Sequence, residues 1–244
     1  MKNGQTILLL HGWIRGKNAR TTYHKTIEEF EKEGFTVFTP DMPGFGEAPI
    51  PTHPLTLNDY SEFLRSFINT HNIKSPILIG HSFGGRVIIK YVSSQTTDVQ
   101  AIVLSGTPGY SPVKKVKWVA FLIISKIGKI LFMLPGLEKI ADRIRGWFYY
   151  IAGARDFYRA QGPMRQTFKN IVGEGIEEGM KKIKVPTLLV WGEEDSIVPV
   201  RIAHRMKETI SQSKLTIIPH VGHKVLIDES HMFVKEVLSF LQSL

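Results

Sequence analysis

The chain has 244 residues with a hydrophobic share of 43%, a charged share of 22% and a formal net charge of +9, values that fit one large globular domain or one domain with an insertion. It contains no cysteine, which excludes disulfides, thiolate nucleophiles and thiolate metal sites. No apolar stretch approaches the roughly 20 residues of a membrane span, and the first apolar run is too short for a signal-peptide core, so we expect a cytoplasmic protein.

Short apolar runs alternate with amphipathic segments through most of the chain. The apolar runs predict strands over 6–10, 35–39, 77–79, 101–105, 187–191 and 215–218. The amphipathic segments predict helices over 22–33, 57–71, 84 onward, 200–211 and 233–244. Because most of these strands are apolar on both faces and alternate with helices, we expect an α/β protein whose parallel sheet is covered on both faces.

The alternation stops between residues 109 and 180, which indicates an inserted helical region. Residues 109–172 hold twelve Lys or Arg against three Asp or Glu, so the rest of the chain is about neutral. This basic excess has three interpretations: a solvated surface, attraction of an anionic substrate or product, or a basic helix around 114–131 in peripheral contact with an anionic membrane surface. No nucleic-acid-binding motif is present, and we expect no nucleic-acid partner.

The centre of the chemistry is the pentapeptide at 80–84, Gly-His-Ser-Phe-Gly, which stands between an apolar strand and a helix. In that context a G-x-S-x-G sequence forms a sharp turn that holds the serine hydroxyl clear of the backbone. Gly80 and Gly84 are expected because a Cβ at either position would collide with the neighbouring strand or helix. Ser82 is therefore the candidate nucleophile.

A serine hydroxyl needs a base, and the base needs an orienting acid. Two later strand ends supply them: acidic residues at 193–195 follow one strand, and His220 and His223 follow the next. In a parallel sheet these turns lie at the same edge as Ser82. The order serine, acid, histidine is the order expected for a serine on such a turn. Asp41, in an earlier turn-rich segment, is expected to bond backbone N–H groups of its own turn.

The chain resembles the capped, single-domain α/β-hydrolase proteins, a group that includes carboxylesterases, lipases and carbon–carbon bond hydrolases. Five motifs carry the resemblance in order: Leu10-His11-Gly12-Trp13, Asp41-Met42-Pro43-Gly44-Phe45-Gly46, Gly80-His81-Ser82-Phe83-Gly84-Gly85, Trp191-Gly192-Glu193-Glu194-Asp195 and Gly222-His223. The resemblance implies an α/β-hydrolase fold with a mostly parallel sheet of about six strands. It also implies a core domain formed by 1–108 and 181–244, with 109–180 as a helical cap over the site.

The same resemblance assigns the site residues. It implies Ser82 as nucleophile, His223 as general base and then acid, and Asp195 as the orienting acid. It makes the backbone N–H groups of Trp13 and Phe83 the oxyanion donors. His223 is preferred to His220 because Gly222 allows a tight turn and matches the family, and Asp195 is preferred to Glu193 and Glu194 because it fits the family spacing.

The substrate pocket is expected beneath the cap, whose apolar and aromatic side chains favour an apolar acyl or aryl substrate. The residues expected at or near the pocket are His11, Gly12, Trp118, Phe121, Trp147 and Val198. His11 and His81 flank the oxyanion loop and the serine turn without being needed for proton transfer, so their expected role is a supporting one.

The predicted activity is cofactor-independent hydrolysis of a small carboxylic ester through an acyl-enzyme. A serine rather than an aspartate at the nucleophile position indicates attack on a carbonyl. No metal-ligand spacing and no phosphate-binding or dinucleotide motif is present, so we expect neither a metal nor a cofactor. The alternatives are a carbon–carbon bond hydrolase acting on ring-cleavage products, or a non-catalytic small-ligand receptor on the same fold. The sequence does not predict an oligomeric state.

Overall fold

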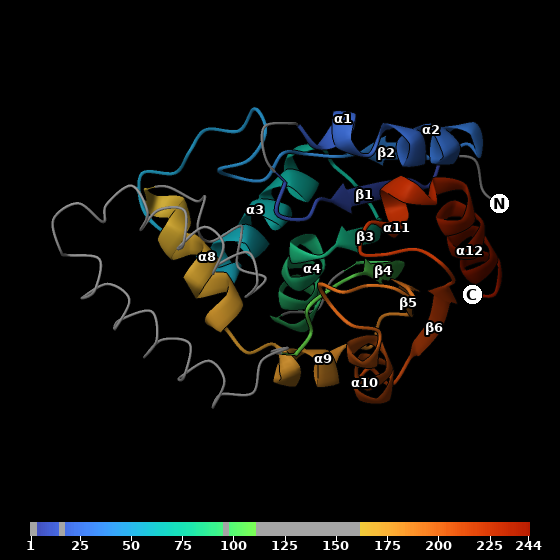
Figure 1. Cartoon of the computed structure of the whole chain (residues 1–244). Coiled ribbons are helices and arrows are strands. Elements are labelled where there is room, and N and C mark those ends of the chain that lie inside the picture. Colours follow the sequence, from blue (N-terminus) through green and yellow to red (C-terminus); the bar gives the residue numbers. More distant parts are fainter. Residues whose placement is uncertain (1–3, 15–17, 95–97, 111–161) are drawn as a thin grey trace, which may run out of the picture.

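The computed structural model describes residues 4–14, 18–94, 98–110 and 162–244 (Figure 1). Its strands are β1 (Thr6–Leu10), β2 (Thr36–Phe38), β3 (Ile77–His81), β4 (Ala101–Ser105), β5 (Thr187–Gly192) and β6 (Ser213–Ile218). They form a six-stranded sheet in the order β2-β1-β3-β4-β5-β6, and each neighbouring pair is parallel. The predicted α/β class and parallel sheet are confirmed.

Helices cover both faces of this sheet. Those described are α1 (Ala19–Thr22), α2 (His24–Lys32), α3 (Leu57–Thr70), α4 (Phe83–Ser94), α8 (Pro163–Gly173), α9 (Glu177–Lys182), α10 (Arg201–Thr209), α11 (Val225–Asp228) and α12 (Ser230–Gln242). Figure 1 shows α1, α2, α11 and α12 together on one side of the sheet, with α3, α4, α9 and α10 on the other.

The two faces give two hydrophobic cores because side chains alternate along a strand. On β1, Leu8 and Leu10 belong to the core with α3, α4 and α10, whereas Ile7 and Leu9 belong to the core with α2 and α12. All four side chains are fully buried. Complete burial of one such side chain contributes about 1.5–3 kcal/mol, so this run of four apolar residues is stable only between two helical layers.

The strand order places the site. From β1 the chain moves outward to β2 and then returns to β3 on the other side of β1. Ligands of open parallel sheets bind where the order reverses, at the carboxyl ends of the strands. Here these ends carry His11-Gly12-Trp13 after β1 and Ser82 after β3.

Most predicted elements are found within a few residues of their expected bounds, and the differences have local causes. The helix predicted over 22–33 is α2, and the short helix α1 before it was not predicted. α1 begins with the Asn18 side chain accepting from the Thr21 N–H at 2.8 Å. β6 starts two residues before its apolar run, with the polar pair Ser213 and Lys214, because it lies at the open edge of the sheet. The one-turn helix α11 was not predicted.

The predicted cap, 109–180, is described only at its two ends. Residues 111–161 lie outside the described part of the chain, and with them Trp118, Phe121, Trp147 and most of the basic excess. At the far end of the segment, α8 begins with Pro163, a residue suited to the first turn of a helix. The division of the chain into core and cap stays a prediction.

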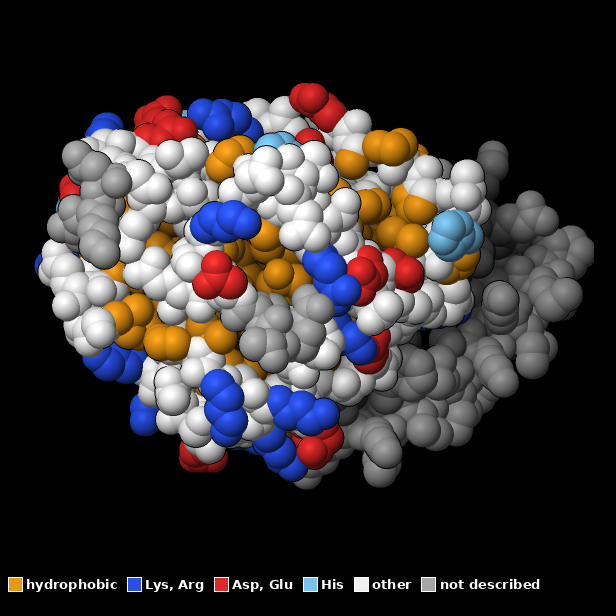
Figure 2. Space-filling model, turned by 180° about the vertical axis from the view of Figure 1, so that it is seen from behind, with side chains coloured by type: hydrophobic (Ala, Val, Ile, Leu, Met, Phe, Trp, Pro, Cys, Tyr) orange, Lys and Arg blue, Asp and Glu red, His pale blue; other side chains and the backbone are white. Residues whose placement is uncertain are grey.

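Outside the cap segment the charges are mixed. Figure 2 shows Lys and Arg side chains interspersed with Asp and Glu side chains over one face of the described residues. Among the helices that the structure describes, none is both long enough and apolar enough to cross a bilayer.

Candidate active site

Ser82 occupies a strained turn between β3 and α4. Its φ is 51°, in the left-handed region that residues other than glycine rarely adopt. Two backbone bonds hold this conformation: the Ser82 N–H donates to the Ser105 carbonyl at 2.8 Å, and the Ser82 carbonyl accepts from the Gly85 N–H at 3.1 Å. The side chain is partly exposed and stands at the N-terminus of α4, where the helix dipole favours negative charge.

The glycines on either side of this turn allow close backbone packing. A Cβ at position 80 would lie 2.5 Å from the Gly85 Cα. A Cβ at position 84 would overlap the carbonyl group of Leu10, the last residue of β1. The expected need for glycine at both positions is confirmed, and its cause is lack of space rather than an unusual φ.

The two predicted oxyanion residues lie beside Ser82. Phe83 is the first residue of α4, so its N–H has no partner within the helix. Trp13 follows Gly12, and a Cβ at position 12 would lie only 3.3 Å from the Ser82 Cβ. The rings of Trp13 and Phe83 also pack edge to face, with centroids 5.7 Å apart.

Asp195 and His223 form a buried pair. The Nδ1 of His223 lies 2.8 Å from the Asp195 Oδ2, and the side chains are 11% and 1% exposed respectively. The other carboxylate oxygen, Oδ1, accepts from the N–H groups of Ile197 at 2.9 Å and Val198 at 2.8 Å. Because the carboxylate can only accept, Nδ1 carries the proton and Nε2 is left as the basic nitrogen.

This pair adjoins the serine turn. Ser105, which accepts from the Ser82 N–H, is followed by Gly106, and a Cβ at position 106 would lie 2.8 Å from the His223 Cε1. The ring of His81, the residue before the serine, lies with its centroid 5.0 Å from that of His223. A hydroxyl at a helix N-terminus, an imidazole and a buried carboxylate are therefore assembled at one edge of the sheet.

The family model described as "Serine aminopeptidase, S33" matches residues 2–230. The chain belongs to the α/β-hydrolase superfamily. Its relatives include the 2-hydroxy-6-oxo-6-(2'-aminophenyl)hexa-2,4-dienoic acid hydrolase of Metapseudomonas resinovorans, 26% identical over 98% of this chain and 84% of that protein. Lipase 1 of Psychrobacter immobilis is 24% identical over 92% of this chain and 73% of the lipase.

The fold agrees with solved structures of the superfamily. An esterase from Exiguobacterium antarcticum superposes with a TM-score of 0.73 at 20% identity, over 99% of this chain and 93% of the esterase. The protein is accordingly a serine hydrolase of the α/β-hydrolase family.

The rival acids and the rival base lie on the surface. Glu193 and Glu194 are exposed, and the His220 side chain is 89% exposed with its Nδ1 3.8 Å from a Glu194 carboxylate oxygen. Asp41 is structural, as expected, and its carboxylate accepts from the Glu47 N–H of its own turn at 2.9 Å. It also accepts from the Ala19 N–H at 2.6 Å, at the start of α1, which was not predicted.

The prediction that Gly222 is needed for a tight turn before His223 is wrong. The positive φ of this turn, 58°, belongs to His220, and a Cβ at position 222 would meet nothing closer than the Glu194 carbonyl at 3.9 Å. The close approach occurs instead at Gly192, where a Cβ would overlap the carbonyl oxygens of Val221 and Gly222.

Two of the expected pocket residues prove to be buried supports. His11 is fully buried: its Nε2 accepts from the Met42 N–H at 3.0 Å and its Nδ1 donates to the Gly12 carbonyl at 2.6 Å. Burial lowers the pKa of His11 to about 4, so the ring is neutral. The Val198 side chain lies in the core, and its carbonyl accepts from the Trp191 Nε1 at 2.8 Å. Gly12, the third expected pocket residue that the structure describes, approaches the serine, since a Cβ at position 12 would lie 3.3 Å from the Ser82 Cβ.

An aromatic wall borders the oxyanion side of the site. The Trp13 ring packs edge to face against Phe45 at 4.8 Å and against Phe168 at 5.0 Å between centroids, and Phe45 lies 5.8 Å from Phe83. Phe168 comes from α8, so the end of the predicted cap contacts the oxyanion loop directly. The sequence analysis missed Phe45 and Phe168 because their position depends on long-range packing.

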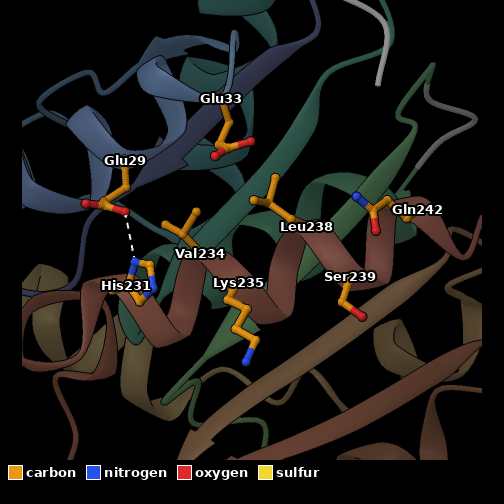
Figure 3. Close-up of a pocket in the computed structure, with 8 residues that line it drawn as sticks. All are labelled: Glu29, Glu33, His231, Val234, Lys235, Leu238, Ser239 and Gln242. Atoms are coloured by element: carbon orange, nitrogen blue, oxygen red, sulfur yellow. Dashed lines mark hydrogen bonds and ion pairs between the residues drawn. The ribbon is translucent and has the colours of Figure 1, made fainter.

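A groove of about 400 Å³ lies elsewhere, between α2 and α12 (Figure 3). Its lining residues are Glu29, Glu33, His231, Val234, Lys235, Leu238, Ser239 and Gln242. Across it the His231 Nδ1 pairs with a Glu29 carboxylate oxygen at 3.1 Å (Figure 3). None of these residues belongs to the serine turn or its partner loops, so this groove is separate from the candidate active site.

Proposed function

We propose that the protein hydrolyses carboxylic esters without a cofactor, through an acyl-enzyme on Ser82. The observation that carries the proposal is the Asp195–His223 pair, which adjoins the strained turn of Ser82 through Gly106 and His81. In this proposal His223 is the general base and acid, and Asp195 orients it and stabilises the imidazolium.

The proposed reaction has two halves. The Ser82 Oγ attacks the ester carbonyl carbon while His223 Nε2 takes the hydroxyl proton. The carbon–alkoxy bond then breaks, and the same proton passes to the departing alcohol. Water repeats the sequence: it loses a proton to His223, attacks the acyl carbon and releases the acid, and the proton returns to Ser82.

The oxyanion of each tetrahedral intermediate would be bound by the backbone N–H groups of Phe83 and Trp13. The first lies at a helix N-terminus, where positive potential is already present. Loss of one such donor typically costs about 10²–10³ in kcat, so the close approach of the two backbone segments is a large part of the proposed catalysis.

We propose an apolar acyl or aryl group as the preferred substrate part. The aromatic wall of Trp13, Phe45, Phe83 and Phe168 supports this choice. The proposal includes 109–180 as a cap, with α8 closing its far end and Trp118, Phe121 and Trp147 as roof residues. Peripheral contact with a membrane forms no part of it.

A second candidate activity is cleavage of an activated carbon–carbon bond in a ring-cleavage product. The specific support is the Metapseudomonas resinovorans relative, which is named as a hydrolase of an aryl-substituted hydroxy-oxo-dienoic acid. The same serine, histidine and aspartate would serve, with a carbon leaving group in place of an alcohol.

The test is a series of p-nitrophenyl esters, from acetate to long acyl chains, for the wild type, Ser82→Ala and Ser94→Ala. Ser94 lies at the other end of α4, where its hydroxyl bonds the Tyr91 carbonyl at 3.1 Å, and provides the matched control. We expect Ser82→Ala to abolish turnover and Ser94→Ala to match the wild type. Turnover that survives in Ser82→Ala would refute the assignment.

A folded wild type that cleaves no ester would refute the ester proposal. Release of an aromatic acid from a 2-hydroxy-6-oxo-6-aryl-dienoic acid would then favour carbon–carbon cleavage. A thermal shift with that compound, without turnover, would favour a receptor.

A further inference from the structure

Tyr23 is a buried residue at the junction of α1 and α2, 58 residues before His81 in the sequence. Its hydroxyl oxygen accepts from the Gly12 N–H at 3.1 Å and also lies 2.8 Å from the Nδ1 of His81. One phenol therefore contacts both the oxyanion loop, which contains Gly12, and the serine turn, which follows His81.

The direction of these bonds follows from His81. Its Nε2 lies 3.0 Å from the backbone carbonyl oxygen of His223, which can only accept. The Nε2 must therefore carry the proton, and Nδ1 must accept from the Tyr23 O–H. A continuous line runs from the Gly12 N–H to Tyr23, from Tyr23 to His81, and from His81 to the His223 carbonyl.

Burial keeps every group in this line uncharged. It lowers the pKa of His81 to about 3 and raises the pKa of Tyr23. The donors and acceptors consequently keep the same directions across the pH range in which an ester hydrolase works. In a buried network each unpaired member is costly, so the line rigidly connects its ends.

We propose that Tyr23 is a positioning residue. Its hydroxyl couples the oxyanion loop at Gly12 to the loop of His223 through His81. This inference rests on the proposed function for its catalytic consequence. Tyr23 fixes the Gly12 N–H, and thereby the loop that carries the Trp13 N–H to Ser82. Through His81 it also fixes the backbone from which the His223 imidazole projects.

The experiment compares the wild type with Tyr23→Phe, which removes the shared hydroxyl and keeps the ring. We expect kcat for p-nitrophenyl esters to fall about 10- to 100-fold, because a displacement of the order of 1 Å in a catalytic group costs up to 10² in rate. KM should change less than about twofold, since no substrate-binding side chain is lost. An unchanged kcat would overturn the proposal.

Tyr110→Phe is the matched control. Tyr110 is also a buried tyrosine, and its hydroxyl bonds Thr209 and the Arg205 carbonyl, on α10. The Tyr110→Phe variant loses a comparable buried hydroxyl that does not contact the site. We therefore expect its kcat to equal that of the wild type. An equal loss of kcat in Tyr110→Phe would show that the effect of Tyr23→Phe is only general destabilisation.

His81→Asn provides a second variant, because the shorter amide can meet Tyr23 but cannot reach the His223 carbonyl. If the line acts as one unit, Tyr23→Phe and His81→Asn together should reduce kcat no more than the worse single change. Multiplicative losses would overturn the coupling.

A measurement without substrate separates this inference from the proposed function. ¹⁵N NMR should show His81 protonated at Nε2 in the wild type. In Tyr23→Phe we expect the Gly12 amide and the His223 ring signals both to shift. Unmoved signals would overturn the inference even if the enzyme is active, whereas shifted signals in a protein that cleaves no ester would count against the proposed function alone.

Discussion

The carboxylate of Asp195 is held by its own loop and turned toward His223, whose Nδ1 lies 2.8 Å from Oδ2. The N–H groups of Ile197 and Val198 both donate to Oδ1, so neither oxygen is free to rotate away. The carboxylate is thus fixed before any substrate arrives, which is the condition for preorganised catalysis.

Replacing Asp195 by Asn should lower kcat about 10³- to 10⁴-fold while leaving the fold intact. The Asn oxygen can still accept from Ile197 and Val198, but its NH₂ then faces His223 Nδ1. That nitrogen must become the acceptor, so the proton moves to Nε2 and the imidazole can no longer act as a base. Steady-state kinetics with p-nitrophenyl esters measures the change.

Glu194→Gln is the control for that substitution. It removes an exposed carboxylate one position away in the same loop, and its kcat should equal that of the wild type. If Asp195→Asn retained more than a tenth of the wild-type kcat, Asp195 would not be the orienting acid.

The sequence was sufficient to predict the sheet and the strand ends that carry Ser82, Asp195 and His223, because these depend on local patterns. The apolar runs 6–10 and 101–105 predicted β1 and β4 at their observed bounds, since a strand buried on both faces is apolar through its interior, and Thr6 and Ser105 stand at strand ends. Ser82, Asp195 and His223 each follow a strand, and the parallel arrangement brings strand ends together.

Features that depend on tertiary contacts escaped prediction. Tyr23 and His81 are 58 residues apart, and no periodicity links a phenol to an imidazole over that distance. A supporting role was expected for His11, but only the fold shows that both its ring nitrogens bond the backbone. The requirement for glycine at 192 rather than 222 likewise depends on how two loops pack.

That packing gives a prediction for a matched pair of glycines. In Gly192→Ala the new Cβ would overlap the carbonyls of Val221 and Gly222 and displace the loop that carries His223. We expect a loss of about 1–3 kcal/mol in the free energy of unfolding, as for other overpacked sites, and a lower kcat. Gly222→Ala has room for its Cβ and should stay within about 0.5 kcal/mol of the wild type.

Urea unfolding of both variants measures these values. Equal losses, or a larger loss in Gly222→Ala, would contradict the packing described for the two loops.

The two buried histidines predict how stability depends on pH. Burial lowers the pKa of His11 to about 4 and of His81 to about 3, whereas both would titrate near 6.5 in the unfolded chain. Below pH 6.5 the unfolded state therefore binds more protons than the folded state. Stability should be complete above that pH and fall as the pH drops toward 4, by up to about 1.4 kcal/mol per pH unit for each histidine.

Urea titrations between pH 7 and 4.5 measure this slope. The groups that surround His81 are His223, Asp195, His11 and Tyr23, and burial outweighs their charges. His81→Asn should flatten the slope, while the exposed His53→Asn should not. A slope that is the same in all three proteins would show that His81 takes up a proton in the folded state.

Arg86, on α4, joins the nucleophile helix to the end of the predicted cap. Its guanidinium is buried and donates to the carbonyls of Pro108, Ile171 and Glu174, the last two at the C-terminus of α8, with the Ile171 distance 2.9 Å. Burial lowers its pKa to about 10, so it remains charged at neutral pH and complements the negative end of the α8 dipole.

Arg86→Met keeps much of the side-chain volume but leaves these carbonyls without their donor. Hydrogen bonds from a charged group contribute about 1.5–3 kcal/mol each, and partial relaxation or water entry would recover some of that. We expect a net loss of about 3 kcal/mol in the free energy of unfolding, measured in urea, and faster proteolysis near α8. Arg20→Met, which removes only the exposed pair with Glu31 at 3.2 Å, should cost less than about 1 kcal/mol. A similarly small loss in Arg86→Met would mean that α8 is held on the core by its apolar contacts alone.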